Sequence, residues 1–454
     1  MTAISLDRPA DGIAQHVRET VRLALPVMLA RCGLIIMITV DTLMVGRAGG
    51  AELAHFAIGY APQITMLTVG IGLLVGTVVL TAQAVGAGRR TLAGRIWRLA
   101  LLVGGSLGCV YAVALLYGEA ILLALGQTPE LAAAGGRVTA MWAVGMPGLL
   151  LYVATSSFLE GISRPKPGMV IMFGANLLNA GLNWAMVFGH LGLPAMGAEG
   201  AVLGTSITRW VMFAAILAYV LRMPDREAYG VSAPLAGHYG QMRKLLALGA
   251  PLALSIGFES STFTAAATFA GWLGAGPLAA YQIAINVNSL VFMLAIGLST
   301  ATAVRVANAV GRGDSLGMRR AGWVGTALAV PPMLLATVVL VAAPEWLAHV
   351  YTDDAAVVLL TLPLFAITAW FCIADGLQGV LMGAVRGTAD ITVPTVIYGL
   401  VFWGIGVPLA YLFAFPFGGG INGLVWGLFV SLVAALVMLA WRFHHLAGRA
   451  IAPI

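Results

Sequence analysis

The sequence predicts an all-α membrane protein that crosses the lipid bilayer many times. Three observations predict this fold class: few charges, long apolar segments and an alternating distribution of cationic residues. Hydrophobic residues make up 60% of the 454 residues, and Asp, Glu, Lys and Arg only 9%, against about 25% charged residues in a typical soluble protein. So little ionic surface excludes a soluble enzyme and a nucleic-acid-binding protein, although the formal net charge is +6.

The apolar segments are long enough to cross the membrane as helices. A helix needs about 20 mostly apolar residues to cross a hydrocarbon core of about 30 Å, and clusters of Gly, Pro and charge divide the chain into twelve such segments. Barrel strands would alternate between apolar and polar residues, whereas these segments are apolar on all sides. The predicted spans are residues 23–46, 56–84, 96–118, 137–160, 168–189, 199–221, 245–272, 278–309, 321–343, 356–384, 391–413 and 423–441.

The cationic residues predict how these spans are oriented. Lys and Arg stay preferentially on the cytosolic side of a membrane. Twenty of the 24 lie in the termini or in the connections that follow spans two, four, six, eight and ten. The opposite connections hold acidic residues such as Glu52, Glu119 and Asp353. Both termini are therefore predicted to be cytosolic, which requires an even number of spans.

The chain also contains an internal repeat. An offset of 225 residues aligns Gly72 with Gly297 and the segment 84–88 with 309–313. Six spans in each repeat give the two halves the same membrane orientation, an arrangement found in transporters that work by movement of two bundles about a central site. A duplication that serves stability alone is the alternative.

The repeat predicts three parts of the chain. Residues 1–221 form an N-terminal six-helix bundle, and residues 245–454 form a C-terminal six-helix bundle with a short cytosolic tail. The long polar segment 222–244 between them is predicted to be a cytosolic linker.

Three acidic residues, Asp41, Glu259 and Asp375, are predicted to lie within the membrane. A charged side chain at the bilayer centre costs about 2.5–3.5 kcal/mol on insertion scales, so an acid kept there is a candidate for a functional role. Each acid could instead be a structural hydrogen-bond partner, or pair with one of the cations Arg31 and Arg209 inside the predicted spans.

Polar and soft side chains share helical faces with these acids. Spacings of three, four or seven residues predict the shared faces. The stripes of Asn and Gln could equally join helices, because amides hydrogen-bond between helices in membranes. The residues predicted to line a substrate cavity with the acids are Met37, Asn176, Asn179, Ser255, Thr262, Gln282, Asn286, Phe371 and Gln378.

Carboxylates in a low-dielectric cavity indicate antiport. They can exchange H⁺, coordinate Na⁺ or attract a cationic solute, and these occupants compete for the same negative charge. One cation that moves inward with the membrane potential supplies about 2.3 kcal/mol per 100 mV. That free energy helps to expel a second solute if the two cannot bind together.

Six segments carry motifs that are specific as a set. They are VDTLMVGRAG at 40–49, FLEGISRPKPGMVI at 158–171, GFES at 257–260 and ADGLQGVLMGAVRGTAD at 374–390, with longer runs at 176–205 and 278–311. The set resembles the multidrug and toxic compound extrusion (MATE) transporters, in particular their bacterial NorM-like branch. The resemblance covers nearly the whole chain.

The resemblance implies two six-helix bundles with a V-shaped central cleft, in the inner (cytoplasmic) membrane of a bacterium. It also implies export of organic, mostly cationic, amphiphilic compounds in exchange for Na⁺ or H⁺ by alternating access. At matching positions, Glu259 and Asp375 would form the cation site, with their carboxylates as Na⁺ ligands, and Asp41 would be the acid of the N-terminal bundle. The expected partners are small organic cations and the lipid bilayer, with no nucleic acid and no cofactor besides the coupling ion. A monomer is expected.

The residues bear on two other classes of function. A flippase for a lipid-linked precursor is the alternative on a similar fold, but it needs a basic cavity for phosphate, and only Arg31 and Arg209 are candidates. An enzyme is not predicted. All seven histidines fall in the tails or near span ends, so they offer no buried nucleophile–base pair or metal site.

Overall fold

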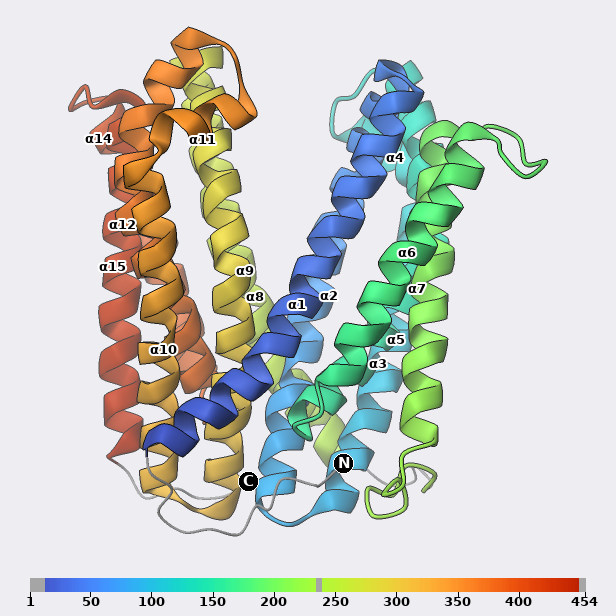
Figure 1. Ribbon diagram of the computed structural model, residues 1–454, viewed down its shortest axis with the longest axis vertical. Helices are drawn as coiled ribbons and strands as arrows, with labels where there is room; N and C mark the ends of the chain where they lie inside the picture. The colour runs from blue at the N-terminus through green and yellow to red at the C-terminus, as the bar shows by residue number, and fades with distance from the viewer. Residues whose placement is uncertain (1–12, 234–238, 449–454) are drawn as a thin grey trace. The chain divides into compact units, whose positions relative to one another are not determined.

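The computed structural model describes residues 13–233 and 239–448, and its regular elements are helices (Figure 1). The part of the chain that it describes contains no strand. The elements are α1 (Ile13–Ala48), α2 (Gly50–Gly86), α3 (Arg90–Leu116), α4 (Gly118–Ala124), α5 (Pro129–Gly161), α6 (Lys166–Phe188), α7 (Gly197–Leu221), α8 (Tyr239–Leu273), α9 (Ala275–Arg312), α10 (Ser315–Ala342), α11 (Pro344–Tyr351), α12 (Ala355–Gly387), α13 (Thr392–Tyr398), the π-helix η1 (Gly399–Gly406), α14 (Val407–Ala414) and α15 (Gly420–Ala447).

The predicted all-α fold with twelve spans is confirmed. Twelve helical stretches of the described residues are long and apolar enough to cross a membrane, and each predicted span overlaps one of them. The observed helices are longer than the predicted spans. For example, α9 has 38 residues, about 57 Å at a rise of 1.5 Å per residue. Hydropathy marks only the apolar middle of such a helix, so it underestimates the length.

The eleventh span, Thr392–Ala414, is not a regular α-helix. The π-helical segment η1 separates α13 from α14, and Pro408 is the second residue of α14. A proline has no N–H for the carbonyl four residues earlier, and its ring clashes with that carbonyl. Wider π turns accommodate the ring while the backbone remains hydrogen-bonded within the membrane.

Contacts divide the chain into two compact units. The N-terminal unit is residues 29–253, and the C-terminal unit combines residues 13–28 with residues 254–448 of the described chain. In the N-terminal unit α2, α3 and α7 pack around α5; in the C-terminal unit α9, α10 and α15 pack around α12 (Figure 1). Each unit therefore has one central helix, at corresponding places in the two repeats.

The unit boundaries lie inside α1 and α8, and not in the polar connection 222–244. Division by contacts and division by repeat are different criteria, so the bundle limits 1–221 and 245–454 stay predictions. Residues 1–12, 234–238 and 449–454, among them Arg8, His238 and Arg449, lie outside the described part of the chain.

Two glycines of the repeat explain how α1 and α8 each contribute to both units. In the N-terminal unit, a Cβ on Gly72 of α2 would lie 2.7 Å from the Cα of Ala253. In the C-terminal unit, a Cβ on Gly297 of α9 would lie 2.9 Å from the backbone nitrogen of Met28. The offset that relates the two glycines also relates Met28 to Ala253. Small residues let membrane helices approach this closely.

Replacing Gly297 by Val tests the approach of α1 to α9. The new side chain would meet backbone atoms of Met28, which cannot rotate aside. Overpacking of this kind costs about 1–3 kcal/mol, so we expect a lower apparent melting temperature of the purified protein. Gly174→Val is the matched control, because nothing lies within 4 Å of a Cβ at that position of α6. Equal melting temperatures for the two variants would contradict the close approach.

Candidate functional site

Asp41 lies on α1 in a hydrogen-bond network that is confined to the N-terminal unit. The carboxylate is fully buried. Its Oδ1 accepts a hydrogen bond from Nδ2 of Asn183 on α6 at 2.5 Å, and its Oδ2 accepts one from the hydroxyl of Thr205 on α7 at 2.8 Å. Nδ2 of Asn179, one turn before Asn183, donates to the same hydroxyl at 2.8 Å. The network thus joins three helices through neutral donors.

The other two predicted cavity residues of this unit lie beside the network. Asn176 donates from Nδ2 to the carbonyls of Gly33 at 3.1 Å and Met172 at 2.9 Å, so it ties α6 to α1. Met37 is buried one turn before Asp41 on α1. Helical spacing predicted that Met37 shares a face with Asp41, and the contacts of Asn176 are those of helix packing.

Arg209 lies on α7, one turn after Thr205, and its guanidinium stacks over the ring of Trp142 at 4.4 Å from the centroid. The residue is only 6% exposed. It makes no ion pair with Asp41, although their charges act on each other. A desolvated cation–π contact contributes about 2 kcal/mol, less than the several kcal/mol that burial of an unpaired ion costs. Arg31, the other candidate cation, lies 4.0 Å from Glu160 instead.

A second acidic site lies in the C-terminal unit around Asp375 of α12. Asp375 is 3% exposed, and its Oδ2 accepts from Nδ2 of Asn288 on α9 at 2.8 Å. The Asn288 amide oxygen in turn accepts from the Cys372 thiol at 3.2 Å. One turn after Asp375, Gln378 donates from Nε2 to the hydroxyl of Tyr398 at 2.5 Å. Two buried acceptors here have no hydrogen-bond donor among the described residues, Oδ1 of Asp375 and Oε1 of Gln378.

Glu259 of α8 faces this second site. It is partly exposed and makes no hydrogen bond or ion pair with a described residue, and its charge acts on that of Asp375. No third His, Cys, Asp or Glu of the described chain joins the pair as a metal ligand. Two carboxylates and an amide oxygen are hard oxygen ligands. Such an arrangement suits a monovalent cation or a proton.

Three further predicted residues, Ser255, Thr262 and Phe371, lie on the same helices as the two acids. Ser255 and Thr395 share a hydrogen bond of 2.8 Å, and the Thr262 hydroxyl donates to the Phe258 carbonyl at 2.9 Å. Phe371 is buried, with its ring 6.2 Å from that of Phe263. These side chains shape the surroundings of the acids.

Gln282 and Asn286 are the two predicted cavity residues of α9, and neither is hydrogen-bonded to Glu259 or Asp375, so their place in a substrate cavity stays a prediction. Both are exposed on α9, and the Asn286 amide oxygen accepts from the Tyr351 hydroxyl at 2.9 Å. The residue that reaches Asp375 is Asn288, which is buried. Two positions along a helix turn it by about 200°, so Asn286 and Asn288 point to nearly opposite sides. The sequence signal that could have found Asn288 is its place on the same face as Ala284 and Tyr281, both buried.

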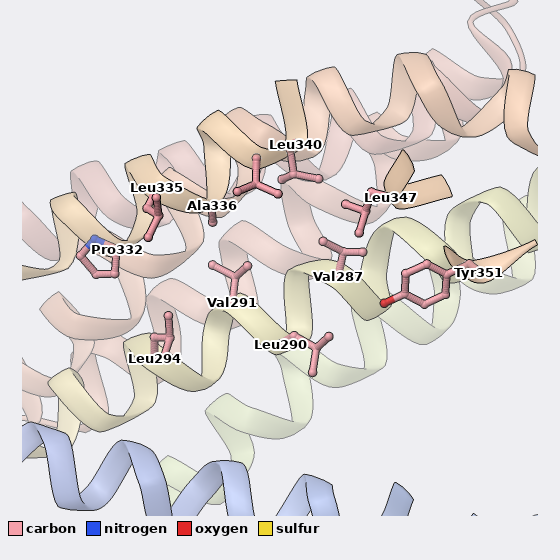
Figure 2. A pocket seen from close by; sticks show the side chains of 11 residues that line it. Val287, Leu290, Val291, Leu294, Pro332, Leu335, Ala336, Leu340, Leu347 and Tyr351 are labelled. Carbon is pink, nitrogen blue, oxygen red and sulfur yellow. The ribbon is translucent and has the colours of Figure 1, made fainter. Parts of the chain in front are cut away.

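An apolar pocket of about 340 Å³ lies apart from these acids in the C-terminal unit, between α9, α10 and α11 (Figure 2). Its lining is aliphatic apart from Tyr351, whose hydroxyl is already bonded to Asn286. No charged side chain lines it, so it has no group that would hold a cation. The lining residues are Val287, Leu290, Val291, Leu294, Pro332, Leu335, Ala336, Val339, Leu340, Leu347 and Tyr351.

Comparisons with known proteins agree on one family. The family model described as MatE matches residues 26–185 and 251–412. A "Probable multidrug resistance protein NorM" of Caulobacter vibrioides is 34% identical, over 99% of this chain and 95% of its own length. A "Multidrug resistance protein NorM" of Burkholderia vietnamiensis is 35% identical over 95% of each. The crystal structure of a Vibrio cholerae MATE transporter, VcmN, matches with a TM-score of 0.88 at 17% identity, over 96% of this chain and 97% of that one. At that identity the structural likeness shows the fold alone.

Replacing Thr205 by Val tests the network around Asp41. Valine keeps the shape but removes the hydroxyl that donates to Asp41 and accepts from Asn179. Buried polar groups that lose a partner cost about 1–3 kcal/mol each, so we expect a clearly lower apparent melting temperature. The control is Thr208→Val, whose buried hydroxyl bonds only to the Gly204 carbonyl of its own helix. The network would be of no importance to stability if both variants melted alike.

Proposed function

This chain belongs to the MatE family and to its bacterial NorM-like branch, and we propose that it is a multidrug efflux antiporter. It exports organic, mostly cationic, amphiphilic compounds in exchange for Na⁺ or H⁺. The support from sequence is that the relatives reported above, named multidrug resistance proteins, align over nearly their full length. None of the proteins reported above is named as an enzyme.

The observation that carries the proposal is the pair of unpartnered acceptors beside Glu259. Oδ1 of Asp375 and Oε1 of Gln378 are buried and have no donor within residues 13–233 and 239–448, and buried polar groups are nearly always paired. Two carboxylates that repel each other add negative charge at the same place. A proton, Na⁺ or the cationic group of a solute would give these acceptors a partner and would reduce the repulsion between the two carboxylates.

Competition for this negative charge couples the two fluxes. A bound coupling cation neutralises the carboxylates that would otherwise hold a cationic solute, so binding of one weakens binding of the other. Alternating access then exposes the site to one side of the membrane at a time. The inward cation gains about 2.3 kcal/mol per 100 mV of membrane potential, which contributes to the export of the solute.

The proposal includes the location of the protein. The described residues contain twelve helices long and apolar enough to cross a membrane, as expected of a multi-pass membrane protein. We place it in the bacterial inner membrane, since the coupling gradients exist there, with both termini cytosolic. The support for this orientation is the gathering of Lys and Arg in alternate connections of the sequence.

The double variant Glu259→Gln, Asp375→Asn tests the acidic pair. Neutral side chains cannot attract a cation, so we expect ethidium efflux from energised membrane vesicles to fall to the background of vesicles that lack the protein. The matched control is Glu345→Gln with Asp353→Asn, which removes two exposed carboxylates outside the spans and should keep the wild-type rate. Wild-type transport with unchanged ion dependence in the first double variant would refute the mechanism.

Proteoliposomes with one imposed gradient at a time test the coupling. We expect either a Na⁺ gradient or a pH gradient to accelerate ethidium transport, because cation binding and solute binding exclude each other at the carboxylates. The acceleration should disappear in the double variant of Glu259 and Asp375. Ethidium transport that neither gradient accelerates would show that the protein moves its solute without ion exchange.

A further inference from the structure

The apolar pocket between α9, α10 and α11 is a slot that runs along two helices (Figure 2). Its α9 side extends from Val287 to Leu294, and its α10 side extends from Pro332 to Leu340. Eight residues of helix rise about 12 Å, which is close to half the thickness of a hydrocarbon core of about 30 Å. The slot therefore has about the length that an acyl chain spans in one leaflet.

The slot is open along one side. Leu290 of α9 and Leu335 and Val339 of α10 are exposed at its rim, Leu335 to 67%, whereas Val287 and Leu340 are buried at its floor. The lining offers no charged group, and its one hydroxyl is already hydrogen-bonded. Water therefore finds nothing to bond in the slot, and both helices are apolar enough to span a membrane. A hydrocarbon chain is the ligand that suits such a lining.

The short helix α11 closes one end of the slot. Its Leu347 lines the slot, whereas Trp346 is 64% exposed and Val350 is also exposed. Tyr351, the last residue of α11, donates from its hydroxyl to the amide oxygen of Asn286 on α9 at 2.9 Å. Exposed Trp and Tyr on a short helix with apolar neighbours are typical of the boundary between lipid headgroups and acyl chains. A chain in the slot would thus continue into a headgroup beside α11.

The charge around α11 favours one kind of headgroup. Residues 341–356 contain three acids and no Lys or Arg, and the longer stretch 321–385 also contains neither Lys nor Arg. Anionic lipids are recognised by clusters of Lys and Arg, and this part of the chain has no such cluster. A headgroup with an ammonium group is attracted by the acids, whereas an anionic headgroup is repelled by them.

We propose that the slot is a binding site for one acyl chain of a zwitterionic phospholipid with an ammonium headgroup, which stays bound and is not exported. An acyl chain that leaves the bilayer for the slot gains no hydrophobic free energy, because both places are apolar. Binding therefore depends on close packing of the chain in the groove and on the charge of the headgroup. The inference goes beyond the proposed function, since lipid binding needs neither ion exchange nor export.

Photo-crosslinking with two lipid probes tests the site. The full-length protein is reconstituted in liposomes of equal parts phosphatidylethanolamine and phosphatidylglycerol, with a trace of either lipid carrying a diazirine on one acyl chain. Labelled peptides are mapped by mass spectrometry after illumination. With the phosphatidylethanolamine probe, we expect labelling of residues 287–294 and 332–351 to exceed severalfold that of α15, whose Val437 and Trp441 are also exposed. The phosphatidylglycerol probe should label the slot about threefold less, the size expected of an exposed charge interaction.

Two tryptophan variants of α10 complete the test. Ala336→Trp fills the slot and should lower its labelling by the phosphatidylethanolamine probe to the level of α15. The matched control is Ala327→Trp, at an exposed position nine residues earlier that faces the opposite side of the same helix, and it should keep the wild-type labelling.

The comparison of the two probes needs only the wild type, so it is decisive even if Ala336→Trp does not fold. Equal labelling of the slot and α15, or equal labelling of the slot by both probes, would overturn the inference. Loss of slot labelling on addition of ethidium would also overturn it, because the slot would then hold a transported solute. Ethidium efflux by the wild type reports on the proposed function separately.

Discussion

The requirement that polar groups be satisfied inside the membrane determines most of this structure. α-Helices satisfy the backbone N–H and C=O groups by hydrogen bonds within each helix. The buried acids meet it mainly through neutral donors, Asn183 and Thr205 for Asp41 and Asn288 for Asp375. Amides and hydroxyls hold a carboxylate in place without cancelling its charge, whereas an arginine in contact would cancel it. A site that must bind and release a cation needs the first arrangement.

The internal repeat sets the framework but not the chemistry. Gly72 and Gly297 make corresponding close contacts in the two units, so helix approach follows the duplication. The acids do not follow the duplication. The sequence has Ala266 at the position equivalent to Asp41 and Leu34 at the position equivalent to Glu259. In the N-terminal unit the candidate acid, Asp41, therefore has both oxygens bonded. The other unit holds two acids with unpartnered acceptors, which favours different roles in one transport cycle.

The sequence predicted the twelve spans because the length of an apolar segment can be counted directly along the chain. It also predicted that Asn176 and Asn179 share one face of their helix, since spacing of three or four residues identifies a helical face; the link from Asn179 through Thr205 to Asp41 is seen only in the structure. It did not distinguish Asn288 from Asn286. The segments are apolar on most sides, so the rotation of each helix about its axis is decided by packing against neighbours. The π turns before Pro408 and the stacking of Arg209 on Trp142 likewise depend on neighbouring helices.

Arg209 shows why opposite charges in one buried network need not form a pair. Direct contact with Asp41 would satisfy both ions, and such a pair would be costly to open because each partner would then be left buried and alone. Because the two ions are not in contact, neither neutralises the other. The cation–π contact with Trp142 offsets only part of the free-energy cost of desolvating the guanidinium. The remainder must be offset by water or by a bound acceptor.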